Sequence, residues 1–127
     1  MITIKESTKL SNGKELDIQY PIRLYDRDGK EVYFEDSEGY WYRREYKDGQ
    51  EVYFEGSSGF WWRSEYKNGN QVYEEDSNGY WSRFEYNDAG KVVYCEDSVG
   101  SWWKKELDEG GNVIYHETSD GYIVDNR

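Results

Sequence analysis

Hydrophobic and charged residues alternate along most of the chain, in short runs that glycine-containing segments interrupt. Residues 31–35 and 40–46 show the pattern, because Val, Tyr, Phe and Trp are interspersed there with Glu and Arg. Alternation with a period of two is typical of β-strands, whose successive side chains point to opposite faces. The pattern therefore predicts an all-β protein with no helix of note.

The two runs recur through residues 24–127 as about five copies, of which the last is truncated. The period is 20 residues between the first copies and 21 between the later ones. A repeat of this length predicts one folded unit, an antiparallel meander of β-hairpins in a single-layer or coiled sheet of roughly 10 to 12 strands. Residues 1–23 do not fit the repeat, and we expect them to form N-terminal capping strands.

The connections between the runs carry glycine at fixed places. Asp48-Gly49 and Asn68-Gly69 are typical of two-residue hairpin turns, which need positive φ at both positions. Residues 27–29, 88–90 and 109–111 predict three-residue loops closed by a glycine bulge, which would absorb the extra residue of the longer copies.

A regular register, extended from a pairing of Tyr46 with Glu51, sorts the side chains onto two faces. We expect the first face to carry the β-branched and Trp rows with their charged neighbours: Val32, Val52, Val72, Val93, Ile114, Trp41, Trp61, Trp81, Trp102, Arg43, Arg63, Arg83, Lys104, Glu45, Glu65, Glu85 and Glu106. We expect the second face to carry Tyr rows and a glutamate ladder: Tyr33, Tyr53, Tyr73, Tyr94, Tyr115, Glu35, Glu55, Glu75, Glu96, Glu117, Tyr40, Phe60, Tyr80, Tyr122, Tyr46, Tyr66 and Tyr86. Cross-strand pairs on each face would contribute about 0.2–1 kcal/mol apiece.

Composition changes the picture in three ways. Hydrophobic residues make up only 35% of the chain, but aromatic residues make up 19%, which argues against disorder despite a net charge of −11. The acidic excess argues against direct binding to nucleic acid or to an anionic membrane. A single cysteine gives no sign of an oxidising compartment, so we expect a cytoplasmic protein, with secretion left open.

Residues that could carry chemistry are few. His116 and Cys95 occupy a position that differs from repeat to repeat, and neither has a partner for catalysis. The thiol of Cys95 could also link two copies of the chain in a dimer. The carboxylates recur with the repeat, as in a solvated edge, and residues 26–29 resemble part of a calcium loop but are better explained as a turn. We therefore predict no catalytic residue, no metal site, no cofactor and no enzymatic activity.

Three resemblances are carried by these motifs. Tyr25-Asp26-Arg27-Asp28-Gly29 resembles the YD (Rhs-type) repeats, which implies hairpin strips that form shells or recognise surfaces. The spacing from Tyr33 to Trp41, with Glu, Ser and Gly at every second position between them, is similar to tandem-repeat orphan proteins of phages and gut bacteria. Residues 29–39 are more weakly similar to choline- and glucan-binding repeats, which implies an aromatic ligand site.

These observations predict a protein-binding repeat module for a partner with a basic surface, and specifically a phage or mobile-element inhibitor of a nucleic-acid-binding or defence protein acting in the host cytoplasm. The candidate acidic face comprises Glu35, Glu55, Glu75, Glu96, Glu117, Tyr33, Tyr53, Tyr73, Tyr94 and Tyr115. A rival hypothesis is a carbohydrate or cell-wall module with an aromatic platform of Trp41, Trp61, Trp62, Trp81, Trp102 and Trp103. A third is a structural unit that self-associates through unpaired sheet edges.

Overall fold

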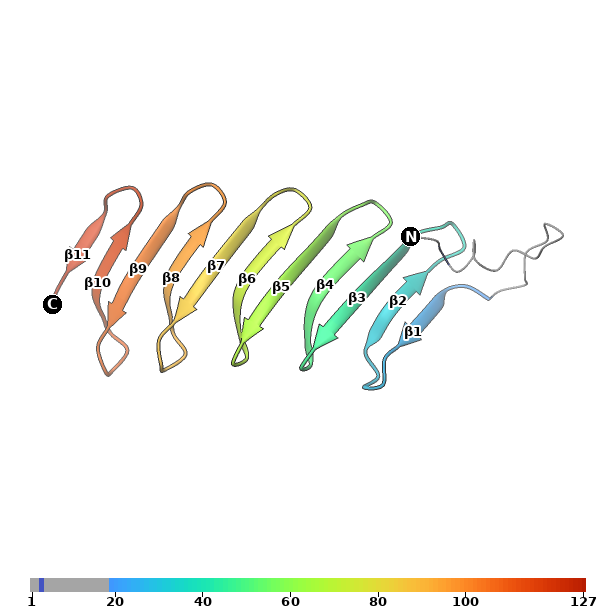
Figure 1. Ribbon diagram of the computed structural model, residues 1–127, viewed down its shortest axis with the longest axis horizontal. Helices are drawn as coiled ribbons and strands as arrows, with labels where there is room; N and C mark the ends of the chain where they lie inside the picture. Colours follow the sequence, from blue (N-terminus) through green and yellow to red (C-terminus); the bar gives the residue numbers. More distant parts are fainter. Residues whose placement is uncertain (1–2, 4–18) are drawn as a thin grey trace. The chain divides into compact units, whose positions relative to one another are not determined.

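The computed structural model describes residue 3 and residues 19–127. Eleven strands follow one another along the chain in one antiparallel meander sheet, in the order β1 to β11 (Figure 1). Their bounds are β1 Ile22–Tyr25, β2 Glu31–Glu35, β3 Trp41–Lys47, β4 Gln50–Gly56, β5 Trp61–Lys67, β6 Asn70–Asp76, β7 Trp81–Tyr86, β8 Val92–Asp97, β9 Trp102–Leu107, β10 Val113–Thr118 and β11 Ile123–Asp125. The predicted all-β hairpin meander is confirmed, and no helix occurs among these residues.

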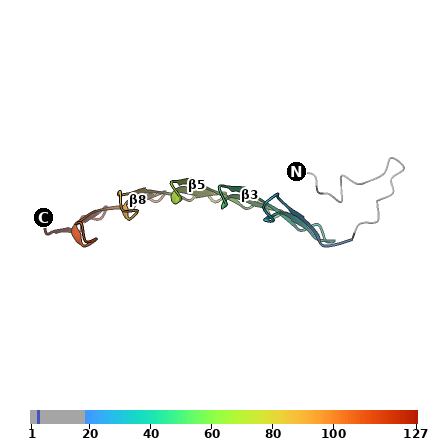
Figure 2. The same cartoon turned by 90° about the horizontal axis from the view of Figure 1, so that it is seen from below.

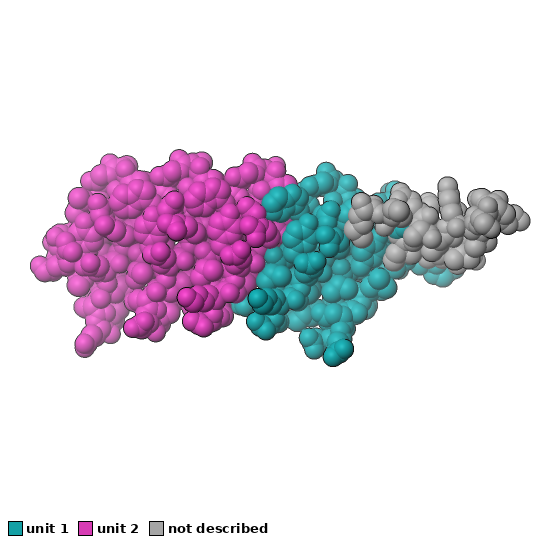
Figure 3. All heavy atoms as spheres, in the orientation of Figure 1, with its two compact units in different colours: residues 1–61 teal, residues 62–127 magenta. Residues whose placement is uncertain are grey.

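The chain divides into two compact units, Met1–Trp61 and Trp62–Arg127, which are coloured separately in Figure 3. Within each unit the described strands form a single layer, as Figure 2 shows. The predicted capping strands fall almost wholly on residues 1, 2 and 4–18, which lie outside the described residues. Ile22 and Arg23, the last two residues of the predicted cap, belong to β1.

The turns form as their sequences predict. Asp48 and Asn68 have φ of 52° and 53°, and the glycines that follow them also have positive φ. In a three-residue loop, Asp26 Oδ1 accepts hydrogen bonds from the main-chain N–H groups of Asp28 and Lys30, which closes the turn without a second strained residue. These local hydrogen bonds explain why both loop lengths end in the same hairpin geometry.

One bulge in each of these hairpins changes the register that a regular pairing predicts. Tyr46 pairs with Glu51 as expected, but the next pair is Glu45 with Tyr53, so Val52 has no cross-strand partner. The corresponding residue is skipped in every such hairpin: Val32, Val52, Val72, Val93 and Ile114. A shift of one residue moves every later side chain to the opposite face.

The predicted division of residues between faces is therefore wrong. Arg43 lies opposite Tyr33 on β2 and opposite Glu55 on β4, and Trp41 lies opposite Glu35, so the Trp, Arg, Tyr and Glu rows share one face. We call this the ladder face, which carries Tyr33, Glu35, Trp41, Arg43, Glu45, Tyr53 and Glu55 in the first unit and Arg63, Glu65, Tyr73, Glu75, Trp81, Arg83, Glu85, Tyr94, Glu96, Trp102, Lys104, Glu106, Tyr115 and Glu117 in the second.

The opposite face carries positions that differ between repeats, and we call it the variable face. Its members include Phe34, Tyr42, Arg44 and Phe54 in the first unit and Ser64, Glu74, Ser82, Phe84, Cys95, Trp103, Lys105 and His116 in the second. Tyr40 packs against Phe34 and Tyr42, and Tyr122 packs against His116. Both residues therefore lie on the variable face, although the sequence predicted them on the same face as the glutamate ladder. Tyr46 and Tyr86 also lie on the variable face, because each comes directly after a ladder-face residue, Glu45 or Glu85, and successive side chains of a strand point to opposite faces.

Candidate functional site: the two faces of the sheet

The ladder face is built from one group of side chains that recurs between neighbouring strands. In the first unit, Arg43 Nε donates to Glu55 Oε2 at 2.7 Å, and the Tyr53 hydroxyl donates to the same oxygen at 3.2 Å. The Arg43 guanidinium carbon also lies 4.9 Å from the centre of the Tyr53 ring. Glu55 is thereby held by a cation and a hydroxyl, while the cation covers the Tyr53 ring.

The second unit repeats this arrangement. Arg83 donates to Glu96 at 2.9 Å from Nη2, and Tyr94 donates to it at 2.7 Å. Lys104 replaces arginine in the last group, and its Nζ lies 3.0 Å from Glu117. The ring of the last Tyr115 is covered instead by Arg127, whose guanidinium carbon lies 4.0 Å from the ring centre.

These contacts shift the titration of the groups that make them. Hydrogen bonds from Tyr94 and Arg83 hold the pKa of Glu96 below its ordinary value. The Arg63 and Tyr73 hydrogen bonds lower the pKa of Glu75 in the same way, and Lys104 lowers that of Glu117. The hydrogen bond to Glu96 also raises the pKa of Tyr94. The predicted glutamate ladder is thus an internally compensated row of ion pairs in the second unit.

A second row of carboxylates on the ladder face is more open to solvent. Glu65 and Glu106 have 58% and 54% of their side-chain surface exposed, whereas Glu75 and Glu117 have 27% and 25%. Glu65 accepts a hydrogen bond from Arg63, at 3.2 Å, and Glu106 accepts one from Arg127, at 3.4 Å. Glu85, at the equivalent position, has no ion-pair or hydrogen-bond partner among residues 19–127. We call Glu65, Glu85 and Glu106 the outer row and Glu75, Glu96 and Glu117 the inner row.

The Trp residues of the predicted platform are divided between the faces. Trp41, Trp81 and Trp102 lie opposite Glu35, Glu75 and Glu96 on the ladder face. Trp62 and Trp103 lie opposite Asp76 and Thr118 on the variable face. Trp61 precedes Trp62 on β5 and so points to the ladder side. The six residues therefore do not form one continuous platform.

Serine residues at one end of the hairpins fasten each repeat to the one before it. The Ser98 main-chain N–H donates to the Trp81 carbonyl at 2.8 Å, and the Trp81 N–H donates to Ser98 Oγ at 3.2 Å. Ser57 makes the same pair of contacts with Trp41. The recurrence of serine at one place in each repeat is the sequence signal for this contact, but it does not identify the partner.

The variable face differs between the units. In the first, Phe34 stacks on Tyr42 with ring centres 5.0 Å apart, and the Arg44 guanidinium lies over both Tyr42 and Phe54. In the second, Ser82 is 2% exposed and its hydroxyl donates to Glu74 at 2.9 Å. The positions that hold Phe34 and Tyr42 in the first unit therefore hold the polar residues Glu74 and Ser82 in the second.

The few residues with candidate chemistry sit among these packing contacts. His116 lies between the rings of Trp103 and Tyr122, at 6.4 and 5.9 Å. Burial raises the pKa of the Cys95 thiol. No group of three or more His, Cys, Asp or Glu residues that could hold a metal ion occurs in the part of the chain that the structure describes. Within that part, no helix has the length and apolar character needed to cross a membrane.

Comparison of the chain with protein-family models and with curated proteins finds no match. The likeness to YD repeats and to the other repeat families therefore stays a prediction that depends on the motifs alone. Function has to be argued from the two faces themselves.

Proposed function

We propose that this protein is a non-enzymatic binding module whose partner is another protein with a basic surface. The observation that carries the proposal is the outer row, because the Arg63 and Arg83 groups each have two carboxylates for one cation, and Glu106, which Arg127 contacts at 3.4 Å, still has 54% of its side-chain surface exposed. The inner carboxylates also accept a hydrogen bond from a Tyr hydroxyl, whereas Glu85 has no ion-pair or hydrogen-bond partner among the described residues, and Glu65 and Glu106 each keep more than half of their side-chain surface exposed.

The outer row is suited to steering a basic partner. Its three members lie at equivalent positions on alternate strands β5, β7 and β9, so successive carboxylates are about 9–10 Å apart by strand spacing. Regularly placed charges of one sign raise association rates and reject partners of like charge. This spacing is wider than that of phosphates along one DNA strand, which favours general electrostatic attraction over literal mimicry of DNA.

Within this class we propose an inhibitor, encoded by a phage or mobile element, of a basic nucleic-acid-binding or defence protein. The net charge of −11 and the similarity to phage repeat proteins support this narrower proposal. An acidic surface that competes with nucleic acid for a basic site would explain why acidic side chains recur in every repeat.

The test compares capture of proteins from a bacterial lysate by the wild-type chain and by a Glu65→Gln/Glu85→Gln/Glu106→Gln variant, at increasing salt. Each captured protein is identified, purified and tested for direct binding in competition with DNA. We expect a basic protein that binds the wild type, loses at least about tenfold in affinity with the variant, and is displaced by DNA.

A matched control carries Asp28→Asn, Glu38→Gln and Glu109→Gln, which change three exposed carboxylates away from the outer row. It changes the net charge by the same amount and should retain binding if the row itself is recognised. Equal weakening by both variants, or absence of a salt-sensitive partner that binds when purified, would contradict the proposal.

A further inference from the structure

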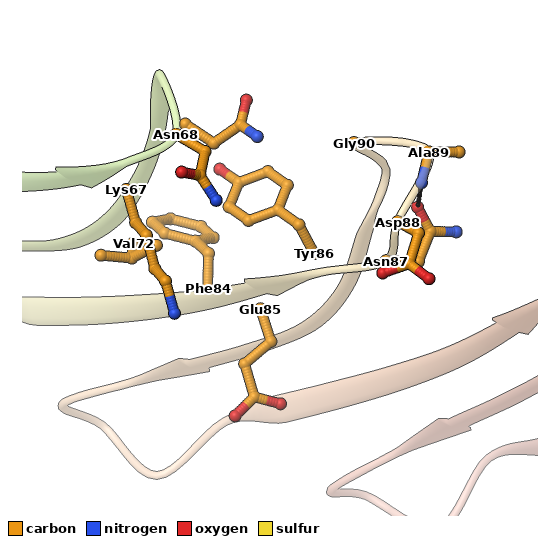
Figure 4. Close-up of a pocket in the computed structure, with 11 residues that line it drawn as sticks. Lys67, Asn68, Val72, Phe84, Glu85, Tyr86, Asn87, Asp88, Ala89 and Gly90 are labelled. Carbon is orange, nitrogen blue, oxygen red and sulfur yellow. Dashed lines mark hydrogen bonds between the residues drawn. The ribbon is translucent and has the colours of Figure 1, made fainter.

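We propose that a groove between two neighbouring hairpin ends of the second unit binds a neutral sugar residue. The groove lies between the β5–β6 turn and the β7–β8 turn and has a volume of about 700 Å³ (Figure 4). Pockets that bind small ligands span about 300–1,000 Å³. The proposal does not rest on the protein-binding proposal, because the ligand contacts it needs come from Phe84, Tyr86 and the asparagine side chains, whereas Glu85, which also lines the groove, projects its side chain to the other side of β7 (Figure 4).

The floor of the groove is apolar and fixed in place. Phe84 and Tyr86 occupy alternate positions of β7 and project to the same side of the strand, whereas Glu85 projects to the other side (Figure 4). Val72 from β6 lies beside Phe84. The Tyr86 hydroxyl donates to the main-chain carbonyl of Gln71 at 2.6 Å, which holds the ring in one orientation. A preformed aromatic surface of this kind can stack against the C–H face of a sugar ring.

The walls of the groove supply amide groups. Asn68 comes from the β5–β6 turn and Asn70 is the first residue of β6, and neither side chain has a hydrogen-bond partner among the described residues. Asn87 Oδ1 accepts hydrogen bonds from the N–H groups of Ala89 and Lys91, each at 3.0 Å. Its NH₂ group is therefore the part left to donate. Together these amides offer both donors and acceptors, as the hydroxyl groups of a sugar require.

The charge of the groove favours a neutral ligand. The charged lining residues are one cation, Lys67, and two carboxylates, Asp88 and Glu85, of which Glu85 projects its side chain to the other side of β7. A phosphate or a carboxylate would meet no cluster of cations, and a metal ion would meet no cluster of carboxylates. The balance of amide and aromatic groups with little net charge is matched by an uncharged polyhydroxyl compound.

The repeat provides an internal comparison. At the next pair of hairpin ends in this unit, Lys105, Leu107 and Asp108 occupy the positions that correspond to Phe84, Tyr86 and Asn87. The stacking ring and the free amide donor are both lost there. The combination of aromatic floor and amide walls thus belongs to this groove and is not a general property of the repeat.

An extended peptide is the other ligand that amides and aromatic rings could hold. Peptides that bind to sheets gain most of their affinity by pairing with an exposed strand edge. Here β6 pairs with β5 and β7, and β7 also pairs with β8, so the strands at the groove have no free edge. A peptide would lack those main-chain hydrogen bonds, and the groove therefore favours a sugar.

The test is a titration of ¹⁵N-labelled protein with maltohexaose, cellohexaose and chitin hexasaccharide, and with an uncharged Gly-Ser hexapeptide, followed by NMR. We expect saturable shifts of the side-chain amide signals of Asn68, Asn70 and Asn87 with at least one oligosaccharide. Shifts confined to Trp indole N–H signals, a stronger response to the peptide, or no saturable shift at millimolar concentrations would overturn the proposal.

Two test substitutions introduce residues that occur at the equivalent positions of another repeat, so the fold should tolerate them. Tyr86→Leu introduces the residue found at position 107, and Asn87→Asp introduces the one found at position 108. Each should raise the dissociation constant roughly tenfold, because one stacking or donor contact is removed. Tyr46→Leu makes the equivalent change in the first unit and should leave the constant unchanged. An unchanged constant in both groove variants, measured on folded protein, would contradict the site.

Discussion

The ladder face and the variable face are made by the same strands, yet they differ in what the repeat keeps constant. On the ladder face of the second unit, Tyr73 and Tyr94 each donate to the Glu two residues further on, and an arginine covers each ring. On the variable face, Ser64, Phe84 and Lys105 occupy equivalent positions. The difference indicates that residues which recur in each repeat hold neighbouring strands together, and that the other face is free to vary.

The largest expected effect comes from removing a ladder ring. Tyr33 is 6% exposed and its hydroxyl donates to Glu35 at 2.7 Å. Tyr33→Ala should lower the free energy of unfolding by about 3 kcal/mol, since it removes a buried ring and a hydrogen bond. Phe34→Ala, the next residue along β2, should cost roughly half as much because Phe34 lies half-buried on the variable face. Urea denaturation measures both, and an equal or larger loss for Phe34→Ala would remove the distinction between the faces.

A smaller effect is expected from the serine that fastens Trp81 to the next repeat. Ser98→Ala removes the acceptor of the Trp81 N–H and should lower the free energy of unfolding by about 1 kcal/mol. Hydrogen exchange of the Trp81 amide should become faster. Ser101→Ala is the control, because Ser101 uses only main-chain atoms in the same turn. If the two variants are equally stable, the side chain of Ser98 does not hold the repeats together.

The ion pairs of the ladder face predict how stability depends on pH. The pKa of Glu96 is lowered in the folded state, so this group stabilises the fold above its ordinary pKa of about 4.3 and ceases to do so as the pH falls through the lower value. The pKa of Tyr94 is raised, so its contribution is lost as the pH rises past about 10. The free energy of unfolding should therefore decrease at acid pH, as Glu96 is protonated, and at alkaline pH, as Tyr94 loses its proton.

Arg83→Gln isolates this contribution. It should raise the pKa of Glu96 towards its ordinary value and move acid unfolding to a higher pH, because Arg83 is one of the two groups that stabilise the carboxylate. NMR titration of the glutamate side chains and unfolding followed by fluorescence give the two readouts. Lys105→Gln, a loss of charge on the variable face, should leave the pKa of Glu96 unchanged. A similar rise in both variants would mean that net charge matters more than the ion pair.

The smallest effect is expected on the variable face itself. His116→Phe introduces the residue found at the equivalent positions 34 and 54, and should change the free energy of unfolding by no more than about 0.5 kcal/mol. Tyr115→His, one residue away on the ladder face of β10, should cost more, since it removes the hydrogen bond to Glu117 and the ring beneath Arg127. Thermal denaturation of both variants would decide the matter, and the reverse order would contradict this comparison.

Much of the architecture could be predicted from the sequence because its causes are local. Asp48-Gly49 and Asn68-Gly69 fix hairpin turns through their own φ angles, and alternation fixes strands between them. The assignment of faces failed because a regular register was extended past residues such as Val52 and Val93, which the bulges leave unpaired. A bulge adds one residue to one strand of a pair, and the alternation of residue types along the chain does not reveal where that happens.

The sequence by itself determined the repeat, the hairpins, the turn positions and the acidic, aromatic composition, since each depends on residues close together in the chain. Only the tertiary structure decided which rows share a face, because one skipped residue per hairpin reverses the orientation of every side chain that follows. It also decided which carboxylates are open to solvent, since Arg63 binds Glu75 on the neighbouring strand more closely than Glu65 on its own. That choice depends on contacts between strands, which the order of residues does not specify.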